Sequence, residues 1–165
     1  MHKSDQDFMA LALLEAKKAH ALNEVPVGAI IVKNGIILGS GFNKVIAEHS
    51  VTSHAEINAI LAAGIFLKNY RLVNTDMYIS LEPCHMCAKA IVDARIKNVF
   101  FSTPEPKTGA IISVDNFFDK KYLNHKVNYQ HGLLQKEGSK LLKDFFQSKR
   151  RFANANYPSN SHVTK

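Results

Sequence analysis

Cys84 and Cys87 are the only two cysteines of the chain, and they lie three residues apart directly after Pro83. Such a pair can act as a redox couple, as a structural staple or as two ligands of a metal. Residues three apart share one face of a helix. In the first turn of a helix the macrodipole favours thiolates, which are the form of cysteine that binds metals. The pair is therefore half of a metal site if another segment supplies the rest.

His54 and Glu56 are the residues that can complete such a site, in the stretch HAE at the start of another predicted helix. A hydrolytic zinc site needs three protein ligands and one position left for water. His54 can be the third ligand, and Glu56 can take a proton from a water whose pKa zinc lowers to roughly 7. Either motif alone is a weak signal. H-x-E followed by P-C-x-x-C is the signature of zinc-dependent nucleobase deaminases, so we predict hydrolysis, with a redox or purely structural site as the alternative.

The elements that position these motifs can be read from local patterns. Ser4 with Asp7 predicts a helix start, and Asn34-Gly35 between two apolar runs predicts a hairpin. Gly39 and Gly41 indicate a close backbone approach or a bulge. Gly64 is expected to end the helix that begins near residue 55. Helices are expected at 4–22, 55–63, 84–94 and 133–152, and strands at 27–32, 36–38, 77–81, 99–102 and 127–129. This alternation predicts one α/β domain whose sheet is partly parallel.

Length and composition fit a single domain, expected over residues 1–152 and followed at 153–165 by a polar tail that is expected to be disordered. The chain has 165 residues, of which 46% are hydrophobic. No apolar run approaches the ~18 residues of a membrane span, and the polar N-terminus carries no secretory signal. Two cysteines are too few for a disulfide framework. We expect a cytoplasmic protein with reduced thiols and no membrane association.

The net charge of +7 is concentrated at the C-terminal end of the chain. Residues 1–120 hold 12 Lys and Arg against 12 Asp and Glu, whereas residues 121–165 hold 9 against 2. A basic segment beside a neutral body indicates a polyanionic partner such as nucleic acid. The alternative is a solvated basic helix without a partner.

Several stretches beyond the metal motifs carry a family resemblance. They are EVPVGAII at 24–31, GSGFN at 39–43, NYRL at 69–72, LEPCHMC at 81–87, PKTGA at 106–110, LNH at 123–125 and DFFQSKRR at 144–151. From about residue 7 to about residue 151 the chain resembles the bacterial tRNA-specific adenosine deaminases. The resemblance implies a three-layer α/β/α cytidine deaminase-like fold with a mixed, mostly five-stranded sheet. It also implies conversion of the wobble adenosine of an arginine tRNA anticodon to inosine.

The resemblance further implies roles for individual residues. One zinc ion per subunit is bound by His54, Cys84 and Cys87, with Glu56 as the proton shuttle. The residues implied to contact the flipped nucleoside are Asn43, Val25, Pro26 and the backbone of Ala55 and Pro83. The residues implied to meet the anticodon stem-loop are Glu105, Lys107, Thr108, Phe145, Phe146, Lys149, Arg150 and Arg151. The family forms homodimers in which each RNA loop touches both subunits.

Several of these residues could instead have a purely structural role or be exposed to solvent without a partner. Asn43 can cap a strand end, Lys107 can be an exposed loop charge, and at least one of Phe145 and Phe146 is expected to pack in the core. The three basic residues at 149–151 can be a solvated helix end. Asn124 and His125 are expected to close a turn.

The chain departs from the family pattern in three places. Glu105 stands where an aspartate is usual, on a loop stiffened by Pro104, which puts its contact to the RNA backbone in doubt. His85 lies between the cysteines in place of an apolar residue and is expected to point away from the metal. Ile111 and Ile112 replace small residues after PKTGA. Glu82 is a tempting second acid, but we expect it to accept hydrogen bonds from backbone N–H groups.

Two other functions remain open from the sequence. A zinc-dependent deaminase of free bases or nucleotides, such as cytosine or guanine, shares the metal signature but has no use for the basic C-terminal helix. A zinc-stapled RNA-binding protein without catalysis has no use for Glu56 beside an open coordination position.

Overall fold

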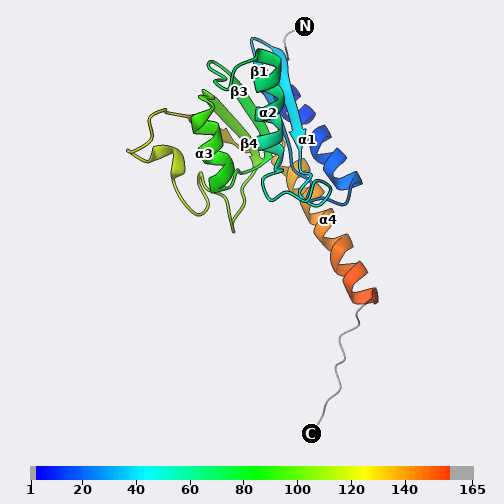
Figure 1. Cartoon of the computed structure of the whole chain (residues 1–165). Helices are drawn as coiled ribbons and strands as arrows, with labels where there is room; N and C mark the ends of the chain where they lie inside the picture. The colour runs from blue at the N-terminus through cyan, green and yellow to red at the C-terminus, as the bar shows by residue number, and fades with distance from the viewer. Residues whose placement is uncertain (1–2, 157–165) are drawn as a thin grey trace.

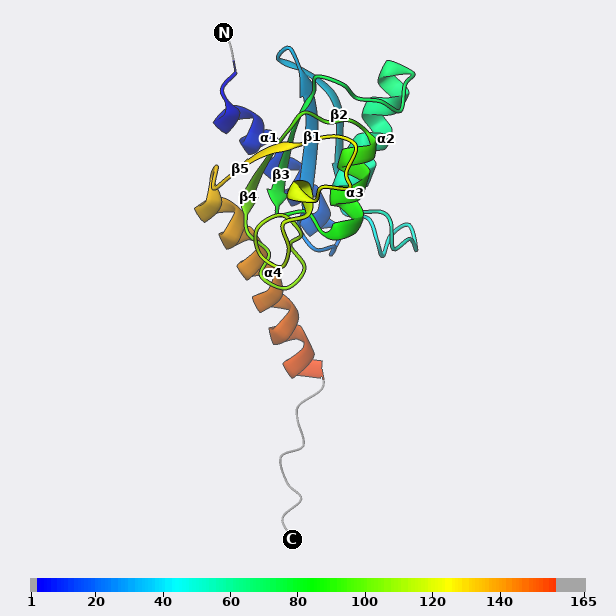
Figure 2. The same cartoon turned by 90° about the vertical axis from the view of Figure 1, so that its left-hand side faces the viewer.

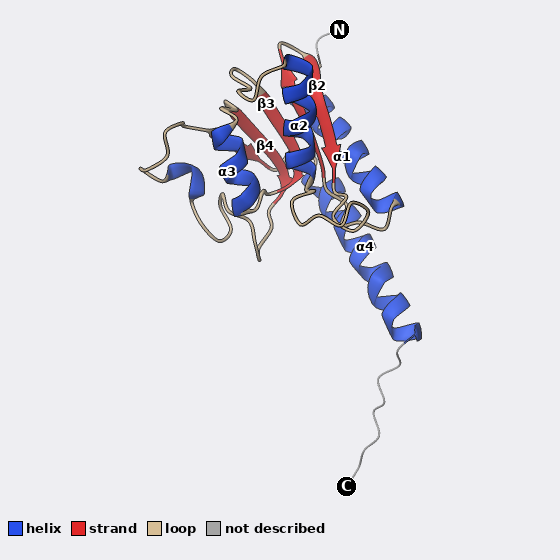
Figure 3. Cartoon of the chain, in the orientation of Figure 1, coloured by secondary structure: helices blue, strands red, loops and turns tan. Residues whose placement is uncertain are grey.

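A five-stranded mixed sheet lies between two layers of helices in this computed structural model, which describes residues 3–156 (Figures 1 and 2). The strands are β1 (Gly28–Lys33), β2 (Ile36–Phe42), β3 (Asp76–Leu81), β4 (Asn98–Thr103) and β5 (Asn128–His131). The helices are α1 (Asp5–Ala21), α2 (Ala55–Leu67), α3 (His85–Asp93) and α4 (Gln135–Asn156), with a short 3-10 helix η1 (Phe117–Asp119) (Figure 3). The predicted three-layer α/β/α fold is confirmed.

Local sequence signals explain where α1 and the first hairpin form. Ser4 and Asp7 make the expected capping box, in which the Ser4 N–H donates to Asp7 Oδ2 at 2.8 Å and the Asp7 N–H donates to Ser4 Oγ at 3.3 Å. Asn34 and Gly35 join β1 to β2, and both have positive φ angles, 51° and 79°. Positive φ at both central residues is the requirement of a type I′ hairpin turn.

The sheet buries a different set of side chains on each face, because alternate residues of a strand point in opposite directions. Ile30 and Val32 of β1 pack with Phe8, Met9 and Tyr78 beneath α1. Ala29 and Ile31 point the other way, into the larger core that α2 and α3 cover. Helices α1 and α4 thus lie on one face of the sheet, and α2 and α3 lie on the other (Figures 1 and 2).

Strand direction brings distant segments to one edge of the sheet. The order is β2-β1-β3-β4-β5, with β1 antiparallel to both β2 and β3, and with β3, β4 and β5 mutually parallel. The carboxyl ends of β2, β3 and β4 therefore meet at the same edge. Asn43, Glu82 and Glu105 follow these three ends in the chain. Crevices outside the carboxyl ends of strands are the usual ligand sites of α/β sheets.

Two glycines of β2 allow α2 to approach the sheet closely. A Cβ atom at Gly39 would overlap backbone atoms of Ala59 and Ala63, and one at Gly41 would overlap the backbone of Ala55 and Ala59. The expected close backbone approach is confirmed, and a bulge lies opposite, between Ile31 and Val32. This packing fixes the N-terminal end of α2, where His54 and Glu56 lie.

Some expected boundaries differ from the structure. Gly64 does not end its helix, because α2 continues to Leu67 and ends where Lys68 adopts a left-handed conformation with φ 51°. Cys84 precedes α3 as its N-cap rather than opening the helix. Helix α4 extends to Asn156, so residues 153–156 of the expected tail are helical. The remainder of that tail, 157–165, lies outside the described residues. Within residues 3–156, no helix has the length and apolar character needed to cross a membrane.

Candidate active site

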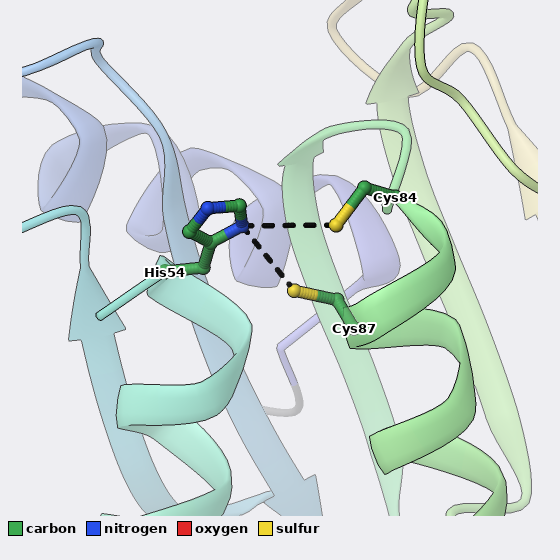
Figure 4. Close-up of side chains that lie close together, drawn as sticks. All are labelled: His54, Cys84 and Cys87. Carbon is green, nitrogen blue, oxygen red and sulfur yellow. Dashed lines mark hydrogen bonds between the residues drawn. The ribbon is translucent and has the colours of Figure 1, made fainter. Parts of the chain in front are cut away.

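His54, Cys84 and Cys87 form a cluster of three metal-ligating side chains (Figure 4). His54 Nδ1 lies 3.8 Å from Cys84 Sγ and 3.5 Å from Cys87 Sγ. Tetrahedral zinc with ordinary Zn–N and Zn–S bond lengths places nitrogen and sulfur ligands about 3.6 Å apart. The spacing and the N/S donor set therefore fit zinc. Three ligands leave a fourth position open, as in hydrolytic sites.

The three side chains converge because two helices begin next to each other. His54 is the N-cap residue of α2, Cys84 is the N-cap residue of α3, and Cys87 lies in the first turn of α3. Neither N-cap side chain makes a capping hydrogen bond, so both are available for a ligand. The positive ends of the two helix dipoles lie beside the sulfur atoms and favour thiolates.

The two cysteines differ in acidity because they share a proton. A hydrogen bond from Cys87, together with one from His54, lowers the pKa of Cys84 to about 4. The same contact with Cys84, reinforced by burial, raises the pKa of Cys87. A metal ion that binds both sulfur atoms displaces that shared proton.

Glu56 lies in the first turn of α2, next to the metal cluster but outside it. Its side chain is buried, with 4% of the residue exposed, and it faces the same cavity as His54 and Cys84. Burial disfavours the charged carboxylate and raises the pKa of Glu56 to about 7. Glu56 is thus a carboxyl group able to gain and lose a proton near neutral pH.

A cavity of about 550 Å³ opens over these groups at the edge where the strand ends meet. Its floor includes His54, Glu56 and Cys84. Its walls come from five segments of the chain: the loop before β1, the loop after β2, the end of β3 with the residue that follows it, the loop after β4, and α4. The wall residues are Asn23, Glu24, Val25, Val27, Asn43, Val45, Ile46, Leu81, Glu82, Glu105, Thr108, Phe145, Phe146 and Lys149.

Asn43 connects the cavity wall to the metal cluster. Its side-chain Oδ1 accepts a hydrogen bond from the N–H of Ala55, the first residue of α2, at 2.9 Å. In the part of the chain that the structure describes, its Nδ2 makes no hydrogen bond to protein. The residue is 9% exposed and lines the cavity, so it holds α2 with one atom and offers a donor with the other.

Other predicted substrate contacts do not all lie in the cavity wall. Val25, Glu105, Thr108, Phe146 and Lys149 line it. Pro26, Ala55 and Pro83 are buried and Lys107, Arg150 and Arg151 are exposed, and none of the six lines the cavity. The α4 pair divides as expected, with Phe145 4% exposed and Phe146 44% exposed.

Four side chains take the structural positions that we expected. Glu82 accepts hydrogen bonds from backbone N–H groups, among them that of Ile112 at 2.7 Å. His85 points away from the cluster, with Nε2 3.1 Å from Asp115 Oδ2. Asn124 accepts from Arg95, and His125 Nε2 lies 2.7 Å from the Ile96 carbonyl oxygen.

Glu24 is a cavity residue that the sequence analysis did not single out. It is 2% exposed, and its Oε1 accepts the N–H groups of Ile46 and Ala47, both at 2.8 Å. These contacts hold the loop after β2 against the cavity. The signal was an acidic residue at the start of the otherwise apolar stretch EVPVGAII.

Comparison with known families and proteins gives a consistent result. A family model described as the cytidine and deoxycytidylate deaminase zinc-binding region matches residues 2–103. The tRNA-specific adenosine deaminase of Haemophilus influenzae is 44% identical over 147 residues, which cover 88% of this chain and 85% of that protein. The enzyme of the same name from Aquifex aeolicus is 43% identical over 143 residues, which cover 87% of this chain and 94% of that protein.

Solved structures are similar as well. One, from a study of A-to-I editing by tRNA deaminases at the wobble position of transfer RNA, has a TM-score of 0.80 and 39% identity, and covers 82% of this chain and 98% of its own. A guanine deaminase from Bacillus subtilis has a TM-score of 0.61 and 33% identity, covering 92% and 97%. The fold is thus shared with an enzyme named for a free base.

Proposed function

Since the chain belongs to the family of tRNA-specific adenosine deaminases, we propose that it converts the wobble adenosine of an arginine tRNA anticodon to inosine. The observation that carries the proposal is the cavity itself. One cavity is lined by His54 and Cys84 of the metal cluster, by the buried carboxyl group of Glu56, and by aromatic and basic residues of α4. A deaminase of a base within RNA requires both parts, since the base must leave its strand to reach the reacting groups.

Zinc is the cofactor, and His54, Cys84 and Cys87 are the residues that would hold it. Bound zinc supplies a water molecule of lowered pKa, which is a competent nucleophile toward C6 of adenine at neutral pH. Glu56 takes the proton of the attacking water and passes it to the ring nitrogen N1. It then carries the second proton to the exocyclic amine, which leaves as ammonia. One carboxyl group serves as base and then as acid.

The remaining cavity residues orient the nucleoside. Asn43 Nδ2 donates to the substrate while Asn43 Oδ1 holds α2 in place. Val25 provides an apolar wall for the base, supported by Pro26 from behind, and the backbone of Ala55 and Pro83 closes the pocket.

The outer rim meets the anticodon loop. Phe146 is an exposed ring at the cavity mouth, on which a base can stack. Lys149 of the wall and the exposed Lys107, Arg150 and Arg151 supply phosphate contacts. Glu105 and Thr108, from the loop after β4, complete the rim.

The resemblance also implies a homodimer, which we include in the proposal. Leu61, Ile65 and Phe66 leave a row of apolar side chains exposed on α2, at 61%, 69% and 64%. Covering by a second copy would remove this row from water. Sedimentation analysis tests the dimer directly. The two free cysteines support a reducing compartment, and we assign the enzyme to the cytoplasm.

The second candidate is a deaminase of free bases or nucleotides, and the similarity to a guanine deaminase favours it. The experiment offers the zinc-loaded enzyme an arginine-tRNA anticodon stem-loop with a wobble adenosine, in parallel with free adenosine, cytidine and guanine. Inosine formed only in the stem-loop supports the RNA substrate. Turnover of a free base or nucleoside with an untouched stem-loop would move the enzyme to the small-molecule class.

A further inference from the structure

The Glu82 carboxylate is the hub of a hydrogen-bond cluster beside the cavity. It is 3% exposed and lies between the end of β3 and Cys84. Its Oε1 accepts the backbone N–H groups of residues 111, 112 and 113, at 3.0, 2.7 and 3.0 Å. Its Oε2 accepts the N–H of Glu105 at 2.9 Å and the Ser113 hydroxyl. No lysine or arginine pairs with it within residues 3–156.

All five donors belong to the loop at 105–113 that follows β4. The loop is also tied to the metal-binding segment, because the Ala110 N–H donates to the Pro83 carbonyl oxygen at 2.9 Å. Gly109 packs directly on the carboxylate, and a Cβ atom there would overlap Glu82 Cδ and Oε2. The loop therefore folds around one buried anion.

The same loop carries two residues of the cavity rim. Glu105 and Thr108 line the cavity, and Lys107 is exposed beside them. The Lys107 N–H donates to the Glu105 side chain at 2.9 Å. Glu82 therefore holds the backbone of Glu105, and the Glu105 side chain in turn holds the backbone of Lys107. Both Glu82 oxygens are occupied as acceptors, which leaves this carboxylate no role as a second proton shuttle.

We propose that Glu82 is a positioning residue for RNA binding. It fixes the loop at 105–113 so that Glu105, Lys107 and Thr108 face the anticodon loop. Glu82 touches neither the substrate nor the reacting atoms and acts through the loop backbone. This inference rests on the proposed RNA substrate.

Two variants perturb the cluster in different ways. In Glu82→Gln one oxygen still serves residues 111–113, but an amide NH2 replaces the oxygen that accepts the Glu105 N–H. Gly109→Ala pushes the loop off the carboxylate without changing any charge. Asp115→Asn is the matched control, because Asp115 belongs to the adjoining segment but bonds His85 and Lys120 away from the cavity.

The first measurement is amide hydrogen exchange of the zinc-loaded protein, followed by mass spectrometry. A hydrogen bond to a charged acceptor is strong enough that its loss should speed exchange at 105–108 by about 10-fold or more. We expect this in both Glu82→Gln and Gly109→Ala and not in Asp115→Asn. Unchanged exchange in the two variants would overturn the positioning role, whatever the substrate.

The second measurement is the Kd for a labelled anticodon stem-loop, taken in a Glu56→Ala background so that no turnover occurs. Loss of one negative charge near RNA should by itself tighten binding. Loop positioning predicts the opposite, a Kd raised about 10-fold or more in both variants. Bound zinc should stay equal to that of the parent. Tighter or unchanged binding would overturn the inference.

A failure of the proposed function can be told apart from a failure of the Glu82 positioning role. If the parent protein binds no stem-loop, the RNA substrate is wrong, and the proposed RNA role of Glu82 falls with it. The exchange measurement still decides whether Glu82 holds the loop.

Discussion

His54 and Cys84 hold the same position in two different helices, since each is the residue immediately before the first helical turn, and their Nδ1 and Sγ atoms lie 3.8 Å apart. The two helix N-termini are brought together by parallel strand directions and by the close packing of α2 on β2. The metal cluster is therefore built on rigid elements, and its properties can be tested one contact at a time.

Cys87→Ala should abolish the metal site. It removes one of three ligands, and even loss of an outer-shell partner costs about 10- to 100-fold in metal affinity. We expect zinc affinity to fall by about 100-fold or more and the thermal midpoint to become insensitive to added zinc. Metal analysis and a thermal scan check both results. His85→Ala is the control, because His85 lies between the cysteines but bonds Asp115. Equal zinc loss in both variants would contradict the ligand assignment.

Two variants of Asn43 should distinguish its hydrogen bond to the start of α2 from its contact with the substrate. Asn43→Asp keeps an oxygen for the Ala55 N–H but loses the side-chain donor, whereas Asn43→Ala loses both. One lost hydrogen bond to substrate predicts a kcat/KM about 10- to 100-fold lower in each variant. Only Asn43→Ala should also lower the urea midpoint. An Asp variant with full activity would exclude Nδ2 as a substrate contact.

The basic end of α4 should raise the affinity for the anticodon stem-loop and make that affinity depend on salt concentration. A triple charge reversal of Lys149, Arg150 and Arg151 should raise the stem-loop Kd and flatten its dependence on salt concentration, since each phosphate contact contributes roughly one unit of slope. Fluorescence anisotropy at several salt concentrations measures both. Lys33→Glu is the control for the change in net charge, because Lys33 lies at the end of β1 that is farther from the cavity. A Kd that moves by the same factor per reversed charge in both variants would indicate a net-charge effect without an α4 interface.

Replacing Gly41 with alanine should destabilise the fold, whereas replacing Gly64 with alanine should stabilise it. Gly41→Ala places a methyl group against the backbone of α2, and overpacking of this kind costs about 1–3 kcal/mol. Gly64 lies within α2, where the nearest atom to an added Cβ is the Asn69 carbonyl oxygen at 3.4 Å. Alanine there should stabilise the fold by up to about 1 kcal/mol through helix propensity. Urea denaturation measures both, and destabilisation by Gly64→Ala would refute the proposed packing.

Local signals predicted the elements and the metal cluster, because each signal lies within a few residues of the structure that it controls. The Ser4 capping box, the Asn34-Gly35 turn and the two metal motifs are of this kind. Gly64 was misjudged as a helix end because a glycine costs only about 1 kcal/mol inside a helix, and the actual end depends on the backbone of Lys68.

The cavity walls could not be predicted in the same way. Glu24 contacts Ile46 and Ala47 more than twenty residues along the chain, and Glu82 contacts a loop that begins at Glu105. No periodicity marks such pairs, since they are created by the order and direction of the strands. The position of α4 over the cavity likewise follows from β5 joining the sheet beside β4.

The central claim is that Glu56 moves the protons of a deamination carried out in this cavity. The most direct measurement is single-turnover formation of inosine in the anticodon stem-loop by wild-type and Glu56→Gln enzymes with equal bound zinc. The account predicts inosine at the wobble position with wild type. It predicts a rate at least about 100-fold lower with Glu56→Gln, because general acid–base catalysis contributes about 10²- to 10⁴-fold. Equal rates in the two enzymes would contradict it.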